Sequence, residues 1–554
     1  MLGRQVFMDT LVLQGVRHIF GNPGTTESPL IDSLLDYPQI AYVMALHEGV
    51  ALGAASYYAQ ATGRTPVVNL HVAPGLGNAL GAMYNAFKAN SPVVVTAGQQ
   101  DTRMRLNDPM LGHDLVAMAA PLTKWSVQAE RADEMAPLLR RAFKVASDAP
   151  SGPVFVSLPI DVMEQETAIG ALAPNRLWRA PAPDPAGIEE IVSLLLACHS
   201  PVIVSGDDVA RAQAHRELVA LAEAIGAPVW FEGLHQHASF PTAHANCRQC
   251  LPFDAAQIRK ALEGADLVLL LGGPFFEDLW FAAGSPFPDK ATVVQIEESR
   301  ERLAYKHGLH AGVVGGLRAS LAALASGLQL EAVPEFKRAA EQRNAALKAL
   351  REVESAAYKA RVEKDWNREP MSMSQAMAEI RSALPENVVI VDESITANLD
   401  LARTIDFRAH GDYFSGRGGG IGQCLAGALG VKLAMPDRPV VAISGDGSAM
   451  YSIQALWSAA HHDLAIVFVI LANREYRVLK HNIDAWRQRF AVTAQHPYQN
   501  MDLAKPDLGF VEMAAGMGVA GTRIGKAADL APALRAAIAT GRPHLLEVAI
   551  EGKR

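Results

Sequence analysis

Residues 445–476 read GDGSAMYSIQALWSAAHHDLAIVFVILANREY, and this stretch decides the expected fold. An apolar run at 440–443 precedes the stretch, and a second apolar run at 466–471 lies near its end. Because the residues between the runs have a helical composition, the pattern predicts one βαβ unit. The two strands of such a unit are parallel, so both end at the same edge of the sheet. We therefore expect Asp446 and Asn473, which follow the two runs, to lie close together.

These strand ends carry ligands that suit a hard cation. Carboxylate and amide oxygens bind Mg²⁺ or Ca²⁺ better than zinc. Gly445 and Gly447 flank Asp446 and would let the backbone approach a diphosphate on that ion. The alternative is an ordinary βαβ turn with a surface aspartate. Asn473, placed after the second run, favours the metal site.

The arrangement resembles the diphosphate-binding motif of thiamine diphosphate (ThDP) enzymes. The resemblance implies that Asp446 and the Asn473 side chain bind the metal, with the main-chain oxygen of Glu475 as a third ligand. The sequence departs from the family at Ala472, where the first of two asparagines is usual. The second asparagine is the usual ligand, so the metal site is expected to survive.

The composition narrows the class of protein. The chain has 554 residues, half of them hydrophobic, which is enough for about three or four domains. A formal net charge of −8 argues against a nucleic-acid partner. The start has too few apolar residues for a signal peptide, and no apolar run reaches the roughly 18 residues that span a membrane. With four cysteines the chain has no disulfide framework, so we expect a cytoplasmic protein.

Apolar runs alternate with helical patterns in three blocks, which predicts an α/β fold of three consecutive, doubly wound parallel-sheet domains. By the resemblance these are a pyrimidine-binding domain (1–178), a central Rossmann-like domain (188–330) and a diphosphate-binding domain (365–554). A Pro-rich linker at 179–187 and a charged helical stretch at about 335–365 are expected between them. The expected strands cover residues 42–46, 67–70, 93–97, 154–158, 202–205, 228–231, 267–271, 293–296, 388–391, 440–443, 467–471 and 544–548.

Glu48 is the candidate for proton chemistry in the first block. It follows an expected strand and precedes a helix rich in small residues, and burial there would raise its pKa. The resemblance assigns to Glu48 the protonation of the aminopyrimidine ring of ThDP held by a partner subunit. The alternative is an acidic residue in the first turn of a helix, where the helix dipole favours it.

The loop from Gly21 to Thr25, GNPGT, resembles the substrate-side loop of benzoylformate decarboxylase and related 2-oxo acid decarboxylases. The family has Ser at the position of Thr25, so a hydroxyl remains for the substrate carboxylate; a capped Pro-Gly turn is the alternative. His71 ends the strand expected at 67–70, and histidine relays protons near neutral pH. By the resemblance His71 handles protons or the carboxylate of the reacting substrate, and the alternative is a structural histidine.

The glycine-rich turn GGGIG, residues 418–422, precedes a small-residue helix and offers close backbone approach and N–H groups. By the resemblance Ile421 supports the bent form of ThDP; the alternative is helix–sheet packing. The other cofactor-binding residues that the resemblance implies are Ser394, Thr396, Gly419, Gly420, Gly445, Gly447, Ser448 and Tyr476. Each hydroxyl taken alone could be an ordinary helix cap.

The resemblance places Asn22, His113, Leu279, Leu479 and His481 around the substrate pocket. Benzoylformate decarboxylase has a histidine at the position of Leu279, so the protonation relay is expected to differ here. His481 or His113 could substitute for it. Slow protonation would instead favour capture of a second aldehyde, which is carboligation.

Residues 235–250 are rich in metal-ligand types, including His244 and Cys247-x-x-Cys250. Zinc is one interpretation, but a second Cys pair and finger spacing are missing, so we expect a surface loop. The middle block has no GxGxxG fingerprint, and we expect no additional cofactor there.

The resemblance covers about residues 1–550 and predicts a ThDP- and Mg²⁺-dependent carbon–carbon lyase, a carboxy-lyase. It would convert an aryl or medium-sized, benzoylformate-like 2-oxo acid to an aldehyde, and could ligate aldehydes to 2-hydroxy ketones. Shared sites imply a homodimer or homotetramer. The alternatives are an acetolactate-synthase-like carboligase, an acyl-CoA lyase, and a catalytically idle ThDP-binding subunit, against which Glu48 argues.

Overall fold

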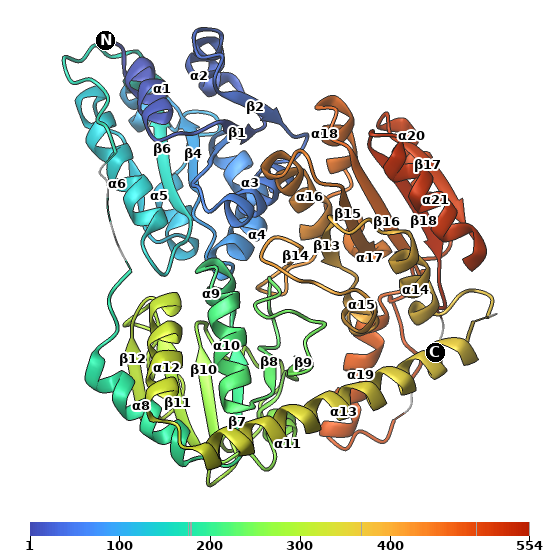
Figure 1. The fold of residues 1–554 in the computed structure, drawn as a ribbon. Helices are drawn as coiled ribbons and strands as arrows, with labels where there is room; N and C mark the ends of the chain where they lie inside the picture. The colour runs from blue at the N-terminus through green and yellow to red at the C-terminus, as the bar shows by residue number, and fades with distance from the viewer. Residues whose placement is uncertain (175–176, 178–179, 367, 495, 553–554) are drawn as a thin grey trace. The chain divides into compact units, whose positions relative to one another are not determined.

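The computed structural model describes residues 1–174, 177, 180–366, 368–494 and 496–552. The chain divides into two compact units. Unit 1 comprises Met1–Leu177, Asp365–Asp400 and Gly416–Arg554, and unit 2 comprises Trp178–Lys364 and Leu401–Ser415. The described residues form three six-stranded parallel sheets, and helices pack against each of them (Figure 1). The α/β class predicted from the sequence is confirmed.

The first sheet lies in unit 1, with strand order β2-β1-β3-β4-β6-β5. Its strands are β1 (His18–Gly21), β2 (Ala41–Met44), β3 (Val67–Leu70), β4 (Val94–Gln99), β5 (Ser126–Gln128) and β6 (Val154–Pro159). The α-helices of this part are α1 (Gly3–Leu13), α2 (Ser28–Ser33), α3 (Glu48–Thr62), α4 (Val72–Lys88), α5 (Leu115–Ala119), α6 (Met135–Ser147) and α7 (Ile160–Glu164). Strands β3 and β6 are buried along their whole length, as expected for strands with both faces covered.

The second sheet lies in unit 2, with order β12-β11-β10-β7-β8-β9. Its strands are β7 (Pro201–Ser205), β8 (Val229–Phe231), β9 (Cys247–Cys250), β10 (Leu267–Leu271), β11 (Thr292–Glu297) and β12 (Ala311–Val314). The helices are α8 (Pro185–Ala197), α9 (Asp207–Arg211), α10 (His215–Ile225), α11 (Ala255–Ala261), α12 (Leu317–Glu331) and α13 (Pro334–Lys364). Helix α13 is the charged helical stretch predicted at about 335–365.

The linker expected at 179–187 is shorter than predicted. Its first residue, Arg179, lies outside the described residues, and helix α8 already begins at Pro185. The Asp184 side chain accepts a hydrogen bond from the N–H of Ala186 at 2.9 Å, and Pro185 occupies the first turn. Aspartate at the N-cap followed by proline in the first turn favours the start of a helix. This local signal outweighs the Pro-rich, polar composition that had predicted a linker.

The third sheet contains β13 (Val389–Glu393), β14 (Tyr413–Ser415), β15 (Val440–Gly445), β16 (Ile466–Ala472), β17 (Ala520–Ile524) and β18 (His544–Ala549). Its five strands in unit 1 follow the order β13-β15-β16-β18-β17. The helices are α14 (Met373–Ala383), α15 (Asn398–Thr404), α16 (Gln423–Ala434), α17 (Asp446–Ala449), α18 (Ala455–His461), α19 (Arg477–Arg489), α20 (Phe510–Gly516) and α21 (Ala527–Ala539). Strands β15 and β16 pair in parallel with Gly445 opposite Leu471, so the predicted βαβ unit is confirmed. Its helical part consists of two short helices, α17 and α18.

The segment 235–250 is not the surface loop that we predicted. His237 and Phe240 are fully buried, and Cys247–Cys250 forms strand β9 of the second sheet. Phe240 and Cys247 belong to the apolar core of unit 2, so the segment closes one side of that core. The sequence did not predict this role, because the apolar residues of the segment occur singly among polar ones and form no apolar run.

Helices α3 and α16 pack closely within unit 1. A Cβ added to Gly53 would lie 2.9 Å from the Cβ of Ala426, and one added to Gly430 would overlap the main-chain oxygen of Ala54. Small residues on both helices therefore allow α3, which begins at Glu48, to lie close to α16, which follows the glycine-rich turn. No helix among the described ranges combines the length and the apolar character that a membrane crossing requires.

Candidate active site

Polar residues gather at the carboxyl ends of strands β1 and β3 in the first sheet. The two strands pair in parallel, so the loop after β1 lies beside His71, which directly follows β3. The Nδ1 atom of His71 lies 2.7 Å from Oε2 of Glu27 and 3.4 Å from Oγ1 of Thr26. A Cβ on Gly24 would overlap the His71 ring, so the glycine makes room for the histidine. The structure thus joins His71 to the predicted substrate-side loop.

Glu27 is a residue that the sequence analysis missed. Its side chain is 2% exposed. It accepts hydrogen bonds from the N–H of Gly98 at 2.9 Å, the N–H of Gly24 at 3.0 Å and the hydroxyl of Thr26 at 2.8 Å. With both carboxylate oxygens fixed, Glu27 can orient the His71 ring: Nδ1 carries the proton toward Glu27 and Nε2 is left as an acceptor. The spacing from Gly24 to Glu27 is a capping-box signal, but the bond to Gly98 could not be foreseen.

Glu48 is the first residue of α3, and its side chain is 7% exposed. Asn78 donates to Oε2 at 3.1 Å through Nδ2, and Asn22 approaches Oε1 at 3.5 Å. The position in the first helical turn agrees with the structural alternative. The two amide donors add a role that a capping acid does not need, since they hold the carboxyl group in one orientation.

Thr25 and His113 lie at the same edge of the first sheet and are both exposed. The main-chain oxygen of Thr25 accepts a hydrogen bond from Ser28 Oγ at 2.8 Å. The main-chain oxygen of His113 accepts one from Nε2 of Gln99 at 2.8 Å, which ties the His113 loop to the end of β4. Both side chains are therefore available to a small molecule at this edge.

The predicted metal ligands meet at the carboxyl edge of the third sheet. Oδ2 of Asp446 accepts the N–H of Arg474 at 2.6 Å, which places this aspartate against the loop that follows β16. Oδ1 of Asp446 accepts the N–H of Gly447 at 2.8 Å, and Oδ1 of Asn473 accepts the N–H of Glu475 at 3.0 Å. Burial raises the pKa of Asp446 to about 6, against the effect of its N–H donors. A desolvated carboxylate of this kind gains from a bound cation.

The Glu475 side chain is engaged elsewhere. It pairs with Lys480, which is buried and also donates to Oδ1 of Asp502 at 2.8 Å. The main-chain N–H of Tyr476 bonds to the oxygen of Met501 at 2.8 Å. The loop after β16 is therefore fixed by an ion pair that the sequence analysis did not anticipate. Because the Glu475 side chain takes part in this pair, we expect Glu475 to reach a metal through its main-chain oxygen.

The residues present fit a diphosphate and its metal. The Oγ atom of Ser394 is buried and has no hydrogen-bond partner among the described residues. A Cβ on Gly445 or Gly419 would meet nothing within 4 Å, so open space adjoins the backbone at both turns. Within the described ranges no group of three or more His, Cys, Asp or Glu residues is placed to hold a metal. The predicted site does not need one, because it uses one carboxylate, one amide and a main-chain oxygen.

The remaining cofactor candidates lie around these strand ends. Thr396 is in a 3₁₀ turn after β13, Ser448 is buried in α17, and the Tyr476 ring packs against Gly447. The glycine-rich turn has φ values of +87° at Gly418, +79° at Gly419 and +91° at Gly422, which glycine adopts most easily. Gly420 lies against Asn85, and Ile421 is half-buried and precedes Gly422, the N-cap residue of α16.

The candidate pocket residues lie in different parts of the molecule. Leu479 and His481 are exposed on α19 in unit 1. Leu279 belongs to unit 2, where its side chain is 60% exposed and its N–H bonds to the oxygen of Phe253 at 3.0 Å.

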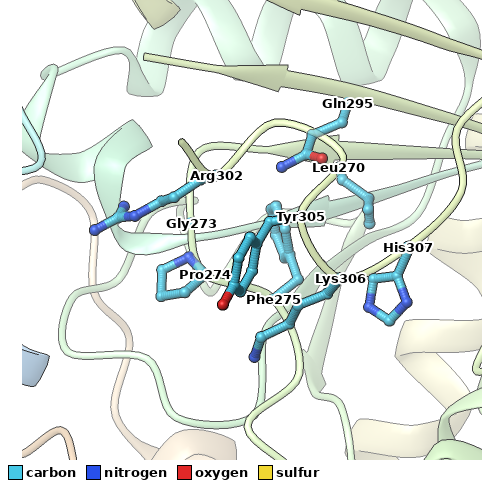
Figure 2. A pocket seen from close by; sticks show the side chains of 9 residues that line it. All are labelled: Leu270, Gly273, Pro274, Phe275, Gln295, Arg302, Tyr305, Lys306 and His307. Atoms are coloured by element: carbon cyan, nitrogen blue, oxygen red, sulfur yellow. The ribbon is translucent and has the colours of Figure 1, made fainter. Parts of the chain in front are cut away.

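A separate pocket, partly open to solvent, lies in unit 2 near the ends of β10 and β11 (Figure 2). Its lining includes Arg302, Tyr305, Lys306 and His307. Arg302 is paired with Asp208 at 2.9 Å, and Lys306 donates to the main-chain oxygen of Phe276 at 3.3 Å. Both cationic side chains therefore already have partners inside unit 2.

Comparison with known proteins agrees with this geometry. The models of the thiamine pyrophosphate enzyme family match the chain as an N-terminal TPP binding domain at residues 1–118, a central domain at 188–324 and a C-terminal TPP binding domain at 395–548. A benzoylformate decarboxylase of Pseudomonas aeruginosa is 35% identical over 96% of this chain and 96% of its own. An acetolactate synthase isozyme 3 large subunit of Escherichia coli is 26% identical over 99% of this chain and 95% of its own.

A solved structure of the thiamine diphosphate-dependent 4-hydroxybenzoylformate decarboxylase of Rhodococcus jostii superposes with a TM-score of 0.85. It is 29% identical, and the match covers 100% of both chains. The chain therefore belongs to the thiamine pyrophosphate enzyme family and, within it, to the thiamine diphosphate-dependent 2-oxo acid decarboxylases.

Proposed function

We propose that this protein decarboxylates an aryl or medium-sized 2-oxo acid of the benzoylformate type to the aldehyde, using ThDP and Mg²⁺ or Ca²⁺. The observation that carries the proposal is the pair of strand-end sites in unit 1, one with His71, Glu27 and Glu48 and the other with Asp446 and Asn473. The similarity to the benzoylformate decarboxylase of Pseudomonas aeruginosa supports the substrate class.

The site in the third sheet is the proposed anchor. Asp446, the Asn473 amide and the main-chain oxygen of Glu475 would hold the metal, as oxygen ligands suited to Mg²⁺ or Ca²⁺. The hydroxyls of Ser394, Thr396, Ser448 and Tyr476, with the backbone of the glycine turns, would bind the diphosphate. When bound, ThDP supplies a nucleophilic carbon and an electron sink for the pair left behind by CO₂. Ile421 would support the cofactor's bend.

The site in the first sheet is the proposed proton exchanger. Glu48 takes up and returns a proton at its carboxyl oxygens while Asn22 and Asn78 hold them in place. His71, oriented by Glu27, accepts or donates a proton at Nε2. The Thr25 hydroxyl donates a hydrogen bond to the substrate carboxylate. Since these groups lie in the first domain and the anchor in the last, we propose a homodimer or homotetramer with shared sites, in the cytoplasm.

Carboligation is the second proposed activity. Leu279 cannot relay a proton, so the aldehyde would be released slowly and a second aldehyde could be captured to give a 2-hydroxy ketone. The similarity to the acetolactate synthase of Escherichia coli favours an acetolactate-synthase-like carboligase as the competing function.

A panel of 2-oxo acids, with benzoylformate and pyruvate included, tests the proposal. The purified protein is incubated with ThDP and Mg²⁺, and CO₂, free aldehyde and 2-hydroxy ketone are measured separately. We expect aryl 2-oxo acids to release one CO₂ for each free aldehyde and two CO₂ for each 2-hydroxy ketone formed from two substrate molecules. Turnover of pyruvate to a 2-hydroxy-2-methyl-3-oxo acid, without free aldehyde, would replace the proposal with the competing function.

A further inference from the structure

A buried carboxylate lies beneath the glycine-rich turn. Glu393 is the last residue of β13, and its side chain is buried. Its Oε1 accepts the N–H groups of Gly422 at 2.8 Å and Gln423 at 3.2 Å, and its Oε2 accepts the N–H of Cys424 at 3.0 Å. These three donors begin immediately after Ile421. The first N–H groups of a helix need an acceptor, and Gly422 at the N-cap position of α16 has no side chain to provide one.

A second buried side chain closes the turn from the other direction. Nε2 of Gln423 donates to the main-chain oxygens of Gly420 at 2.7 Å and Arg417 at 3.1 Å. The turn has little stiffness of its own, because three of its residues are glycines with positive φ. Its conformation in this structure is therefore held by the hydrogen bonds of Glu393 and Gln423.

The surroundings of Glu393 disfavour the ionised form of its carboxyl group. Its pKa is raised to about 7: burial is the largest cause and the neighbouring Asp392 adds to it, whereas the three N–H donors act in the opposite direction. Asp392 is itself held by the N–H of Ser394 at 2.8 Å and by Nδ2 of Asn398 at 2.7 Å. The Cys424 thiol donates to the main-chain oxygen of Val391 at 3.1 Å and stays protonated, because burial raises its pKa. The carboxylate is thus balanced by backbone dipoles at the start of α16.

We propose that Glu393 is a positioning residue whose ionised carboxylate fixes the turn at 418–422, and with it Ile421, in the conformation that accepts the cofactor. This inference rests on the proposed function, because it concerns the same ThDP site. The ionised group accepts at both oxygens, whereas protonation turns one oxygen into a donor that opposes an N–H group. The buried charge of Glu393 is therefore unfavourable for stability, but it fixes the conformation of the turn.

The sign of the stability effect separates this role from a purely structural one. A raised pKa means that Glu393 stabilises the fold below its ordinary pKa of 4.5 and that this stabilisation is lost as the pH rises through about 7. Glu393→Gln removes the charge, so above pH 7 the variant should be as stable as the wild type or more stable. Its amide nitrogen cannot accept a hydrogen bond from the helix, so its cofactor affinity should fall. Stability and affinity are thus predicted to move in opposite directions.

The test compares wild type, Glu393→Gln and the exposed control Glu386→Gln as apo proteins. ThDP affinity in saturating Mg²⁺ is measured by fluorescence quenching from pH 5.5 to 8.5, with denaturant unfolding at the same pH values. We expect the affinity ratio of wild type to Glu393→Gln to be near one at pH 5.5 and to reach at least about tenfold at pH 8.5, with Glu386→Gln unchanged. In Glu393→Gln, amide hydrogen exchange at Gly422–Cys424 should be faster than in the apo wild type.

Each contrary outcome has a separate meaning. An affinity ratio that stays near one at every pH, or a variant that loses stability and affinity in parallel above pH 7, overturns the role of Glu393 alone. A wild-type protein that does not bind ThDP at any pH overturns the proposed function and this inference with it.

Discussion

The first and last domains of unit 1 share a strand order but use it for different chemistry. The order β1-β3-β4-β6-β5 in the first sheet corresponds to β13-β15-β16-β18-β17 in the third. In the third sheet the buried Glu393 is the last residue of β13, and in the first sheet the buried Glu27 ends the 3₁₀ turn in the segment after β1. Glu27 reaches a side chain, the ring of His71, whereas Glu393 reaches only backbone N–H groups. The carboxyl edge of the first sheet is therefore suited to moving protons, and the carboxyl edge of the third sheet is suited to holding a ligand.

Glu48→Gln is expected to have the largest effect, because it removes the proton exchanger and leaves the anchor intact. Turnover of the preferred 2-oxo acid should fall by about 10²–10⁴-fold. ThDP binding, measured by titration of the apo protein, should change little. Loss of binding together with turnover would contradict the division of labour between the two edges.

Asp446→Ala tests the opposite edge. Without this carboxylate, Mg²⁺-dependent ThDP affinity should drop on the order of 100-fold. Chelation of the metal should have the same effect on the wild type, and re-addition of Mg²⁺ should restore binding in the wild type only. If the variant and the wild type respond equally to Mg²⁺, Asp446 is not a ligand.

Glu27→Gln sharpens the comparison between the two buried glutamates. The His71 ring would lose its charged partner, and kcat should fall by about 10–100-fold, in the range of other orienting partners. The pH dependence of kcat should shift, while ThDP affinity stays as in the wild type. The control is Glu134→Gln, which changes an acidic residue of the same domain that is not buried. It should leave kcat and ThDP affinity unchanged.

Unit 2 provides a contrast, because its fully buried His237 packs against other rings, whereas His71 lies against a carboxylate. His237 packs 5.4 Å from His410 and 5.3 Å from Phe414, measured between ring centroids. Burial lowers the pKa of His237 to about 3 and that of His410 to about 4, although Asp207 and Asp412 oppose these shifts. Both rings are neutral in the fold, so stability is present above pH 6.5 and is lost as the pH falls.

We expect His237 alone to destabilise the protein by about 2 kcal/mol between pH 6.5 and pH 5. The His237→Phe variant should lose correspondingly less stability over this interval in denaturant unfolding. Its activity at neutral pH should be close to that of the wild type. An identical acid response in variant and wild type would mean that His237 titrates freely.

The strands that the sequence predicted best are the ones buried on both faces. β3 and β10 match the expected ranges 67–70 and 267–271, because a strand covered on both sides is a continuous apolar run. The strands β5 and β17, with sequences SVQ and AGTRI, gave no such signal. Each lies at the edge of its sheet and is only partly buried, so its pairing depends on the neighbouring strand rather than on its own composition.

The candidate site shows the same limit. Asp446 and Asn473 could be placed together from the sequence because one βαβ unit brings them to one edge. Glu27 could not be assigned to His71, since its anchor at Gly98 lies on another strand. Glu393 was hidden for the same reason, because its three donors begin α16, far along the chain. Local patterns predict strand ends, whereas the partner of a buried charge is fixed by tertiary packing.

A structure of the protein with ThDP and Mg²⁺ tests the central claim most directly. We predict the metal between the Asp446 carboxylate, the Asn473 amide oxygen and the main-chain oxygen of Glu475, with Glu48 of a second copy at the aminopyrimidine ring. A cofactor bound elsewhere, or a metal that does not touch Asp446, would contradict the account.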